Sequence, residues 1–336
     1  MKVWSTYILP RVVHNLEVTL INPSAVGIME AYQRKTMKQL QHLPECTSNP
    51  VTYLLCGILP IEGEIHKRVL TTFTRLLRDT SSAEYRIIRR QLALKDLSSN
   101  SWTSGVRMLT HMYGLPSAHD LLLNNPYKDG WKREVKRAIH VFHTEALKEE
   151  CSKHASTRYI NLASCSTRRT HHVWTSAGSN VREINRAVVK AKLLTGTYQL
   201  EGRKALMHRG GTHSGLCPLC GLETETRKHF LCECSALEDV RKRYLQELQD
   251  VPILIPSNLE CQLKIILDPS HATQEDHRLQ KAETITRRLC FALHHRRLLL
   301  LDAKSAPAAS TSQCAAAHPA AKPGVPRTTW EHHDTR

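Results

Sequence analysis

The chain has 336 residues, of which 41% are hydrophobic and 5% aromatic, and its formal net charge is +16. This length and apolar content are enough to bury a core and suggest about two domains, which excludes a chain that is disordered throughout. The longest apolar run, residues 51–61, is too short to cross a bilayer, and the N-terminus lacks an apolar signal segment. We therefore expect a soluble intracellular protein, cytoplasmic or nuclear, without a membrane partner.

The first 155 residues are predicted to form an array of helices. Leu, Ile and Val are common and aromatic residues are few, which is typical of packed helices rather than a β-sandwich. Ser24 is expected to cap a helix that ends near residues 42–44, and residues 47–59 to form a packed connector or a short helix. Apolar residues that recur three and four apart predict further helices at 61–77, 82–94, 101–113, 117–123 and 130–151.

A polar, irregular stretch at residues 161–180 marks the boundary between two halves, and we assign residues 1–155 to the first and 156–301 to the second. The second half is predicted to contain helices at 181–194, at about 235–250 and at about 273–301. A Ser-x-x-Glu capping box, Ser235 with Glu238, is expected to open the middle one. Residues 302–336 are rich in Ala, Pro, Ser and Thr without periodicity, so we expect a disordered tail.

The positive charge is concentrated in one segment. Residues 158–209 contain ten basic side chains against two acidic ones, a net charge of +8. A charge of this size is costly in self-repulsion unless a polyanion is near, so we expect contact with the backbone of RNA or DNA. Solvated helix faces are the alternative explanation of such a run. Three of the cations follow one another at four-residue spacing and should form a stripe on one helix face. The predicted nucleic-acid contacts are Arg182, Arg186, Lys190, Lys192, Arg203, Lys204 and Arg209.

The most specific motif is a cysteine-rich stretch at residues 213–235. Cys217, Cys220, His229 and Cys234 follow the spacing C-x2-C-x8-H-x4-C, which supplies the four ligands of a closed, structural Zn²⁺ site. Gly221 can adopt the positive φ that a tight metal-binding turn requires. The predicted fold is thus mainly α: a helical array, a small zinc-knuckle module and a long C-terminal helix.

Other interpretations of this stretch remain open. A Cys-x-x-Cys pair can be redox-active, but that needs a preceding strand and a helix that starts on the pair, whereas Gly and Thr precede this one. The thiols could also be inert, Cys232 could replace Cys234, and His213 could replace His229. We expect the remaining cysteines, of eleven in all, to be reduced thiols. The adjacent pairs His171-His172, His294-His295 and His332-His333 are assigned no role, because adjacent side chains on a helix do not face each other.

The sequence resembles the C-terminal, post-polymerase region of reverse transcriptase polyproteins from non-LTR (LINE-like) retrotransposons. The resemblance extends to about residue 301 and rests on segments 8–17 (ILPRVVHNLE), 57–60 (GILP), 190–198 (KAKLLTGTY), 217–221 (CPLCG) and 229–234 (HFLCEC). It implies that residues 1–155 correspond to the thumb or connection segment after the polymerase palm. It also implies that Cys217, Cys220, His229 and Cys234 are knuckle ligands in a module that helps to hold RNA or target DNA.

The chain departs from this family in the residues of catalysis. A polymerase needs adjacent aspartates to hold two Mg²⁺ ions about 4 Å apart, and the sequence contains no Asp-Asp pair. The acidic residues after Cys234 that could serve a nuclease (Asp268, Glu275, Asp276 and Glu283) fall on a predicted loop and helix, without a Pro-Asp motif.

We therefore expect no enzymatic activity and no small-molecule substrate. The predicted function is that of a non-catalytic nucleic-acid-binding fragment of a retrotransposon reverse transcriptase, with structural zinc. Its partners are RNA or DNA and, by resemblance, a separate reverse transcriptase. The alternative is a zinc-containing helical module for protein–protein interaction without nucleic-acid binding.

Overall fold

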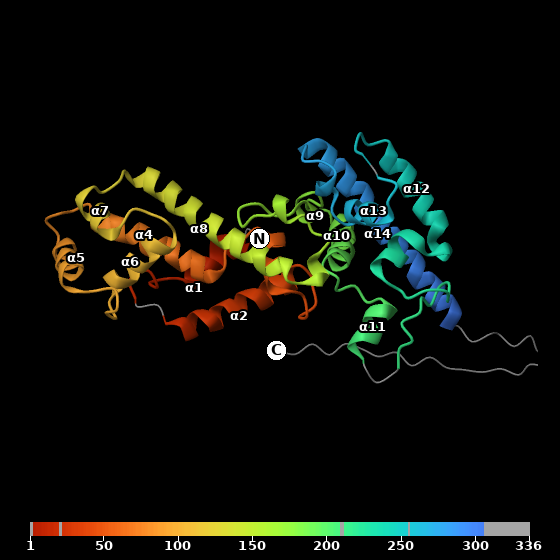
Figure 1. Ribbon diagram of the computed structural model, residues 1–336, viewed down its shortest axis with the longest axis horizontal. Helices are drawn as coiled ribbons and strands as arrows, with labels where there is room; N and C mark the ends of the chain where they lie inside the picture. Colours follow the sequence, from red (N-terminus) through yellow and green to blue (C-terminus); the bar gives the residue numbers. More distant parts are fainter. Residues whose placement is uncertain (1–2, 20–21, 209–211, 255, 306–336) are drawn as a thin grey trace, which may run out of the picture.

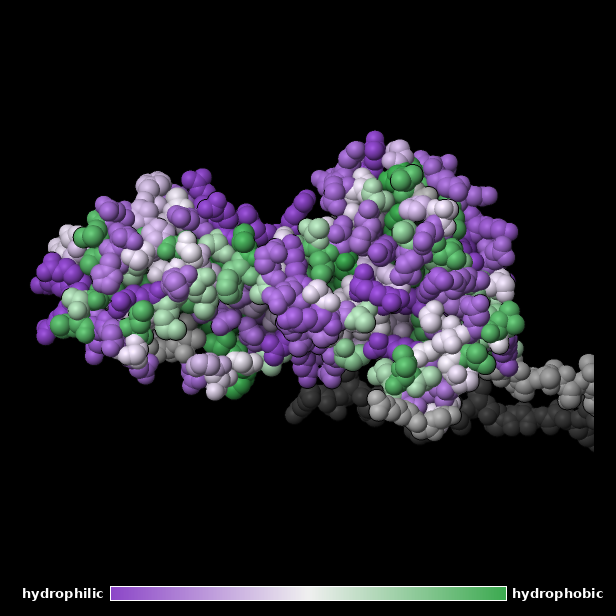
Figure 2. All heavy atoms as spheres, in the orientation of Figure 1, coloured by the Kyte–Doolittle hydropathy of each residue, from purple (hydrophilic) through white to green (hydrophobic). Residues whose placement is uncertain are grey.

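The computed structural model describes residues 3–19, 22–208, 212–254 and 256–305, which form helices joined by turns and loops (Figure 1). About 68% of the structure is helical. The described residues contain no strand, and their β-type pairing is limited to two isolated bridges. The prediction of a mainly α fold is confirmed. Hydrophilic side chains cover most of the face shown in Figure 2. No described helix combines the length and the apolar character needed to cross a bilayer.

The N-terminal array is built around the long helix α8, which packs against α4 and α3. The hydroxyls of Ser82, Ser101 and Ser117 cap α5, α6 and α7 by accepting hydrogen bonds from first-turn N–H groups. The predicted cap of α2 was wrong by two residues, because the side chain of Asn22 accepts the hydrogen bond from Ser24 N–H. The elements are a π-helical turn (Trp4–Ile8), α1 (Leu9–Val12), α2 (Pro23–Leu40), α3 (Asn49–Cys56), α4 (Ile61–Leu76), α5 (Ala83–Leu94), α6 (Trp102–Met112), α7 (Ala118–Leu123) and α8 (Lys128–Ser152).

The C-terminal part is organised around a second long helix, α14, against which α10 and α12 pack. Its elements are α9 (His172–Thr175), α10 (Val181–Leu194), α11 (Glu201–Met207), α12 (Glu238–Gln249), α13 (Leu259–Leu267) and α14 (Asp276–Ser305). Residues 302–305, predicted to belong to a disordered tail, continue α14 instead. The rest of the predicted tail, 306–336, lies outside the described residues.

One hydrophobic cluster spans the two predicted halves, beside a second that lies within the first half. Leu54 of α3 and Leu147 of α8 belong to the same buried cluster as Leu193 of α10 and Leu289 of α14. The chain also approaches itself closely where α3 ends at Gly57: φ is +67°, and an added Cβ would lie 2.3 Å from the backbone of Arg169. Only glycine fits such a position. The division at residue 155 stays a prediction, and the packing is continuous across it.

Three buried histidines of the first half make stability depend on pH. Tyr113 Oη lies 2.7 Å from His66 Nδ1 and 3.1 Å from His143 Nε2, while His140 Nδ1 lies 2.8 Å from Thr167 Oγ1. Burial lowers the pKa of each of the three histidines to about 4. At pH values below about 6.5, the ordinary pKa of histidine, the unfolded chain binds protons at these residues that the folded chain does not bind. Stability is therefore lost as the pH falls from about 6.5 to about 4.

As the pH falls through this window, we expect each of these histidines to reduce the free energy of unfolding by about 1.4 kcal/mol per pH unit. Urea unfolding at pH 7.5 and 5.5 measures the loss, and His140→Gln should remove about one histidine's share of it. An identical loss in wild type and variant would contradict the assignment to His140. Other acid-sensitive groups contribute equally to the loss in both proteins, so their contribution cancels in the comparison.

Candidate metal centre

The first two predicted zinc ligands lie on a tight hairpin. Leu216 and Thr224 form an isolated antiparallel bridge, and inside it Cys217 N–H donates to the carbonyl of Glu223 (2.7 Å). Gly221 N–H donates to the carbonyl of Cys217 (2.8 Å). Gly221 has φ of +71° with open space around it, so its role is conformational, as the sequence predicted. The turn places the thiols of Cys217 and Cys220 on one side.

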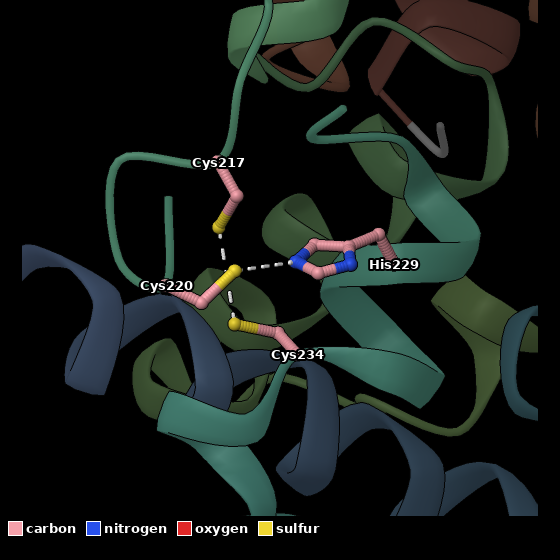
Figure 3. A group of neighbouring side chains, drawn as sticks. All are labelled: Cys217, Cys220, His229 and Cys234. Carbon is pink, nitrogen blue, oxygen red and sulfur yellow. Dashed lines mark hydrogen bonds between the residues drawn. The ribbon is translucent and has the colours of Figure 1, made fainter. Parts of the chain in front are cut away.

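The other two ligands lie at the ends of a π-helical turn, His229–Glu233: His229 is its first residue, and Cys234 follows its last. Cys234 N–H closes this turn onto the carbonyl of His229 (2.7 Å). The Sγ atoms of Cys217 and Cys234 are 3.8 Å apart, and Cys220 Sγ lies 3.3 Å from His229 Nε2. All four ligand atoms lie within 4.8 Å of one another and face a common centre (Figure 3). A tetrahedron with bonds of about 2.3 Å to sulfur and about 2.05 Å to nitrogen has edges of about 3.8 and 3.5 Å, so the group is spaced to hold a metal ion.

The electrostatics of the cluster also suit a metal. Burial acts to raise the pKa of Cys220, but hydrogen bonds from the backbone of Leu222 and Glu223, from Cys217 and from His229 outweigh it and lower the pKa to about 7. Burial raises the pKa of Cys217, and that of Cys234 to about 12. Cys220 is thus the thiol that is most readily ionised, and a metal ion would displace the protons of the other two.

Neighbouring side chains orient the ligands. Glu223 Oε2 lies 3.1 Å from His229 Nδ1, so the carboxylate holds the ring with its Nε2 toward the sulfurs. Arg241 of α12, which is buried, donates to the carbonyls of Leu231 (3.0 Å) and Cys234 (2.8 Å). Lys304 near the end of α14 donates to the carbonyls of Pro218 and Leu219 at 2.6 and 3.0 Å. The hairpin is therefore fixed to α14 and the π-turn to α12.

The alternative ligands lie elsewhere. Cys232 packs at the margin of the core, and burial raises its pKa to about 11. His213 Nδ1 lies 3.0 Å from Glu201 Oε2. The predicted capping box does not form: a 3-10 turn, Ser235–Leu237, precedes α12, which begins at Glu238 without a side-chain cap.

The predicted basic stripe is corrected at Lys190. Its side chain is 0% exposed, and its Nζ donates to Glu283 Oε2 and Thr286 Oγ1, both at 2.7 Å. A nucleic acid cannot reach an ammonium group held in this way. On the same helix, Arg182 is exposed, Arg186 pairs with Glu183 and Lys192 is half-buried. Of the remaining predicted contacts, Arg203 donates to the carbonyl of Gly196, Lys204 pairs with Glu201 at 2.5 Å, and Arg209 lies outside the described residues.

The structure brings together a different set of cations, of which the sequence interpretation named Arg203 as a contact but not Arg158 or Arg227. Arg158, Arg203 and Arg227 line one cavity of about 560 Å³ beside the hairpin. The guanidinium groups of Arg158 and Arg227 lie 4.6 and 4.5 Å from the ring centre of Tyr159. Burial, followed by the charges of Arg158 and Arg203, lowers the pKa of Arg227 to about 10. The available sequence signal was the charge excess of segment 158–209, which does not contain Arg227.

Comparisons of the chain with protein-family models, curated proteins and solved structures give no match. The functional proposals therefore depend on the residues of this chain.

Proposed function

We propose that this protein is a non-catalytic nucleic-acid-binding protein whose binding region is stabilised by zinc at Cys217, Cys220, His229 and Cys234. The proposal includes the relationship, implied by the resemblance, to the post-polymerase region of LINE-like reverse transcriptases. The observation that carries it is the cavity lined by Arg158, Arg203 and Arg227, because it gathers three guanidinium groups next to the metal-binding hairpin.

The cavity has the chemistry of a phosphate site. Glu225, the acidic residue among its lining residues, is already paired with Arg297 through two hydrogen bonds of 2.7 and 2.8 Å. The three guanidinium groups therefore keep a net positive charge. Arg203 Nε is buried without a hydrogen-bond partner, which leaves one donor unsatisfied. Guanidinium groups are suited to phosphate because they donate in a planar fork.

The cavity's contribution can be measured through the salt dependence of binding. Single-stranded RNA and DNA should bind with an affinity that falls as salt rises, with a slope of about −0.7 per neutralised phosphate. We expect Arg158→Gln with Arg203→Gln to flatten the slope by about 1.4. Arg227 is left intact, because it donates to the carbonyls of Ser156 (3.1 Å) and of Leu193 and Leu194 (both 3.2 Å).

The matched control is Arg182→Gln with Arg186→Gln, two cations on α10 that lie outside the cavity lining. Flattening in the control instead of the cavity variant would place the contact on α10. Binding that does not depend on salt in any variant would remove the nucleic-acid proposal.

One observation favours the alternative, a protein-interaction module. A cavity of about 760 Å³ adjoins α6 and the start of α7. It is lined partly by Leu97, Met108 and Met112, which are 55%, 56% and 44% exposed. Exposed apolar groups that gather in this way mark contact surfaces for other molecules. Under this alternative, the protein would bind a protein partner and show no salt-dependent affinity for nucleic acids.

A further inference from the structure

A second group of metal-ligating side chains lies buried between α9, α13 and α14, apart from the cysteine cluster. The side chains of His171 and His172 are 2% and 12% exposed, and that of Asp268 is 0% exposed. His171 is the N-cap of α9, in extended conformation, and His172 is the first helical residue. The helical geometry that would turn adjacent side chains apart does not apply there, and the two rings lie 3.8 Å apart, centre to centre.

The polar atoms of this group are close together without being hydrogen-bonded. His171 Nε2 lies 3.4 Å from Asp268 Oδ2, and His172 Nε2 lies 3.0 Å from Asp268 Oδ1. Both Nε2 atoms are buried, and neither forms a well-aligned hydrogen bond. Atoms that lie near each other but are not aligned for hydrogen bonding are typical of ligands that face a common ion. Ligands at about 2.05 Å from a tetrahedral metal are about 3.3 Å apart, and the two nitrogen–oxygen distances of 3.4 and 3.0 Å lie on either side of this value.

Asp268 is held in place by groups that donate to it. Its Oδ2 accepts from Asn161 N–H at 2.7 Å, and its Oδ1 accepts from the N–H and hydroxyl of Ser270 at 3.1 and 2.6 Å. These donors fix the orientation of the carboxylate, as partners behind a metal ligand do.

The buried charges around the group are net negative, which favours the binding of a cation. Asp268 and Glu283 are both 0% exposed, and Lys190 compensates one of the two carboxylates. Glu283 Oε1 has no hydrogen-bond partner, while Glu283 Oε2 lies 3.5 Å from His172 Nε2. One lysine for two buried carboxylates leaves an excess of negative charge that a bound cation would balance.

We propose that His171, His172 and Asp268 form a second metal site, for a divalent first-row transition-metal ion such as Zn²⁺ or Co²⁺, with Glu283 as a neighbouring counter-charge. Imidazole and carboxylate donors suit ions of this class. Coordination through Nε2 of His171 places the ring proton on Nδ1 and so breaks the 3.3 Å hydrogen bond from Val173 N–H. The ion joins the start of α9 to the end of α13 beside α14. The ion enters from the side of His172, which is the least buried of the three ligands.

Cobalt titration of the untagged full-length chain distinguishes this site from the cysteines by their spectra. To exclude metal binding by the histidine pair of the C-terminal segment, the experiment uses a chain that carries His332→Gln and His333→Gln. One Co²⁺ should bind with sulfur-to-cobalt charge-transfer absorption, at the Cys217 cluster. A second should bind with ligand-field bands only, because its donors are nitrogen and oxygen.

His172→Gln in the same background should lose the second ion and keep the first. The matched control is His295→Gln, a change in another adjacent histidine pair, which should bind both ions. The proposal is overturned if the parent chain binds one ion, if the second ion also gives charge-transfer bands, or if His172→Gln retains it. If His172→Gln also loses the cysteine-bound ion, the variant has not folded. The number of ions bound by the parent chain and their spectra then decide whether the second site exists.

Discussion

Cys220→Ser is expected to lower the free energy of unfolding by more than about 3 kcal/mol, because zinc binding at such sites contributes about 10–16 kcal/mol of folding free energy in isolated peptides. Cys220 carries the thiol whose pKa is lowered to about 7 and lies 3.3 Å from His229 Nε2. Its replacement would leave three of the four proposed zinc ligands. Denaturant unfolding followed by circular dichroism measures the loss, and limited proteolysis should locate it in residues 213–235.

The control is Cys232→Ser, which changes a cysteine of the same segment that lies outside the group. We expect it to cost less than about 1 kcal/mol, as a small change at the margin of a core. A larger loss for Cys232→Ser than for Cys220→Ser would show that Cys232 is a ligand and that the assignment to Cys234 needs revision.

Lys190→Met is expected to destabilise the protein by about 3–5 kcal/mol, because it leaves the carboxylate of Glu283 buried without its cation. Lys190 Nζ donates to Glu283 Oε2 and Thr286 Oγ1, both at 2.7 Å, and neither charged side chain is exposed. Urea unfolding measures the loss. Combining the change with Glu283→Gln should restore part of the stability, since the remaining group is neutral.

Lys192→Met is the matched control on the same helix. Lys192 is half-buried, and a substitution away from a buried pair costs about 0.5 kcal/mol or less. Equal losses in the two variants would contradict the structural role of Lys190. Nucleic-acid affinity at a temperature where Lys190→Met is folded should match that of wild type, because the buried ammonium contacts no ligand.

Local patterns predicted much of the helical structure. The helices at 82–94, 101–113 and 117–123 follow from apolar spacing and from serine caps that lie next to them in the chain. The proximity of the Cys217 and Cys220 thiols was also predictable, because a two-residue gap and a glycine place two thiols on one turn whatever the surrounding fold. The capping box at Ser235 failed, since the backbone between Cys234 and Glu238 forms a 3-10 turn.

Features that join distant parts of the chain were not predictable in this way. Lys190 has the four-residue spacing of an exposed stripe, but its partner Glu283 lies 93 residues further along. His171 and His172 gain a possible function only because Asp268 is brought to them by the packing of α13. Arg158, Arg203 and Arg227 likewise meet in one cavity through the fold. Spacing determines which residues share a helix face, whereas burial depends on tertiary packing.

Zinc content is the measurement that tests the central claim most directly. Protein purified without chelators in reducing buffer should contain at least one zinc ion per chain by native mass spectrometry, and Cys217→Ser with Cys220→Ser should contain one fewer. Wild-type protein without zinc, or a double variant that retains as much zinc as wild type, would contradict a structural zinc site at the four ligands.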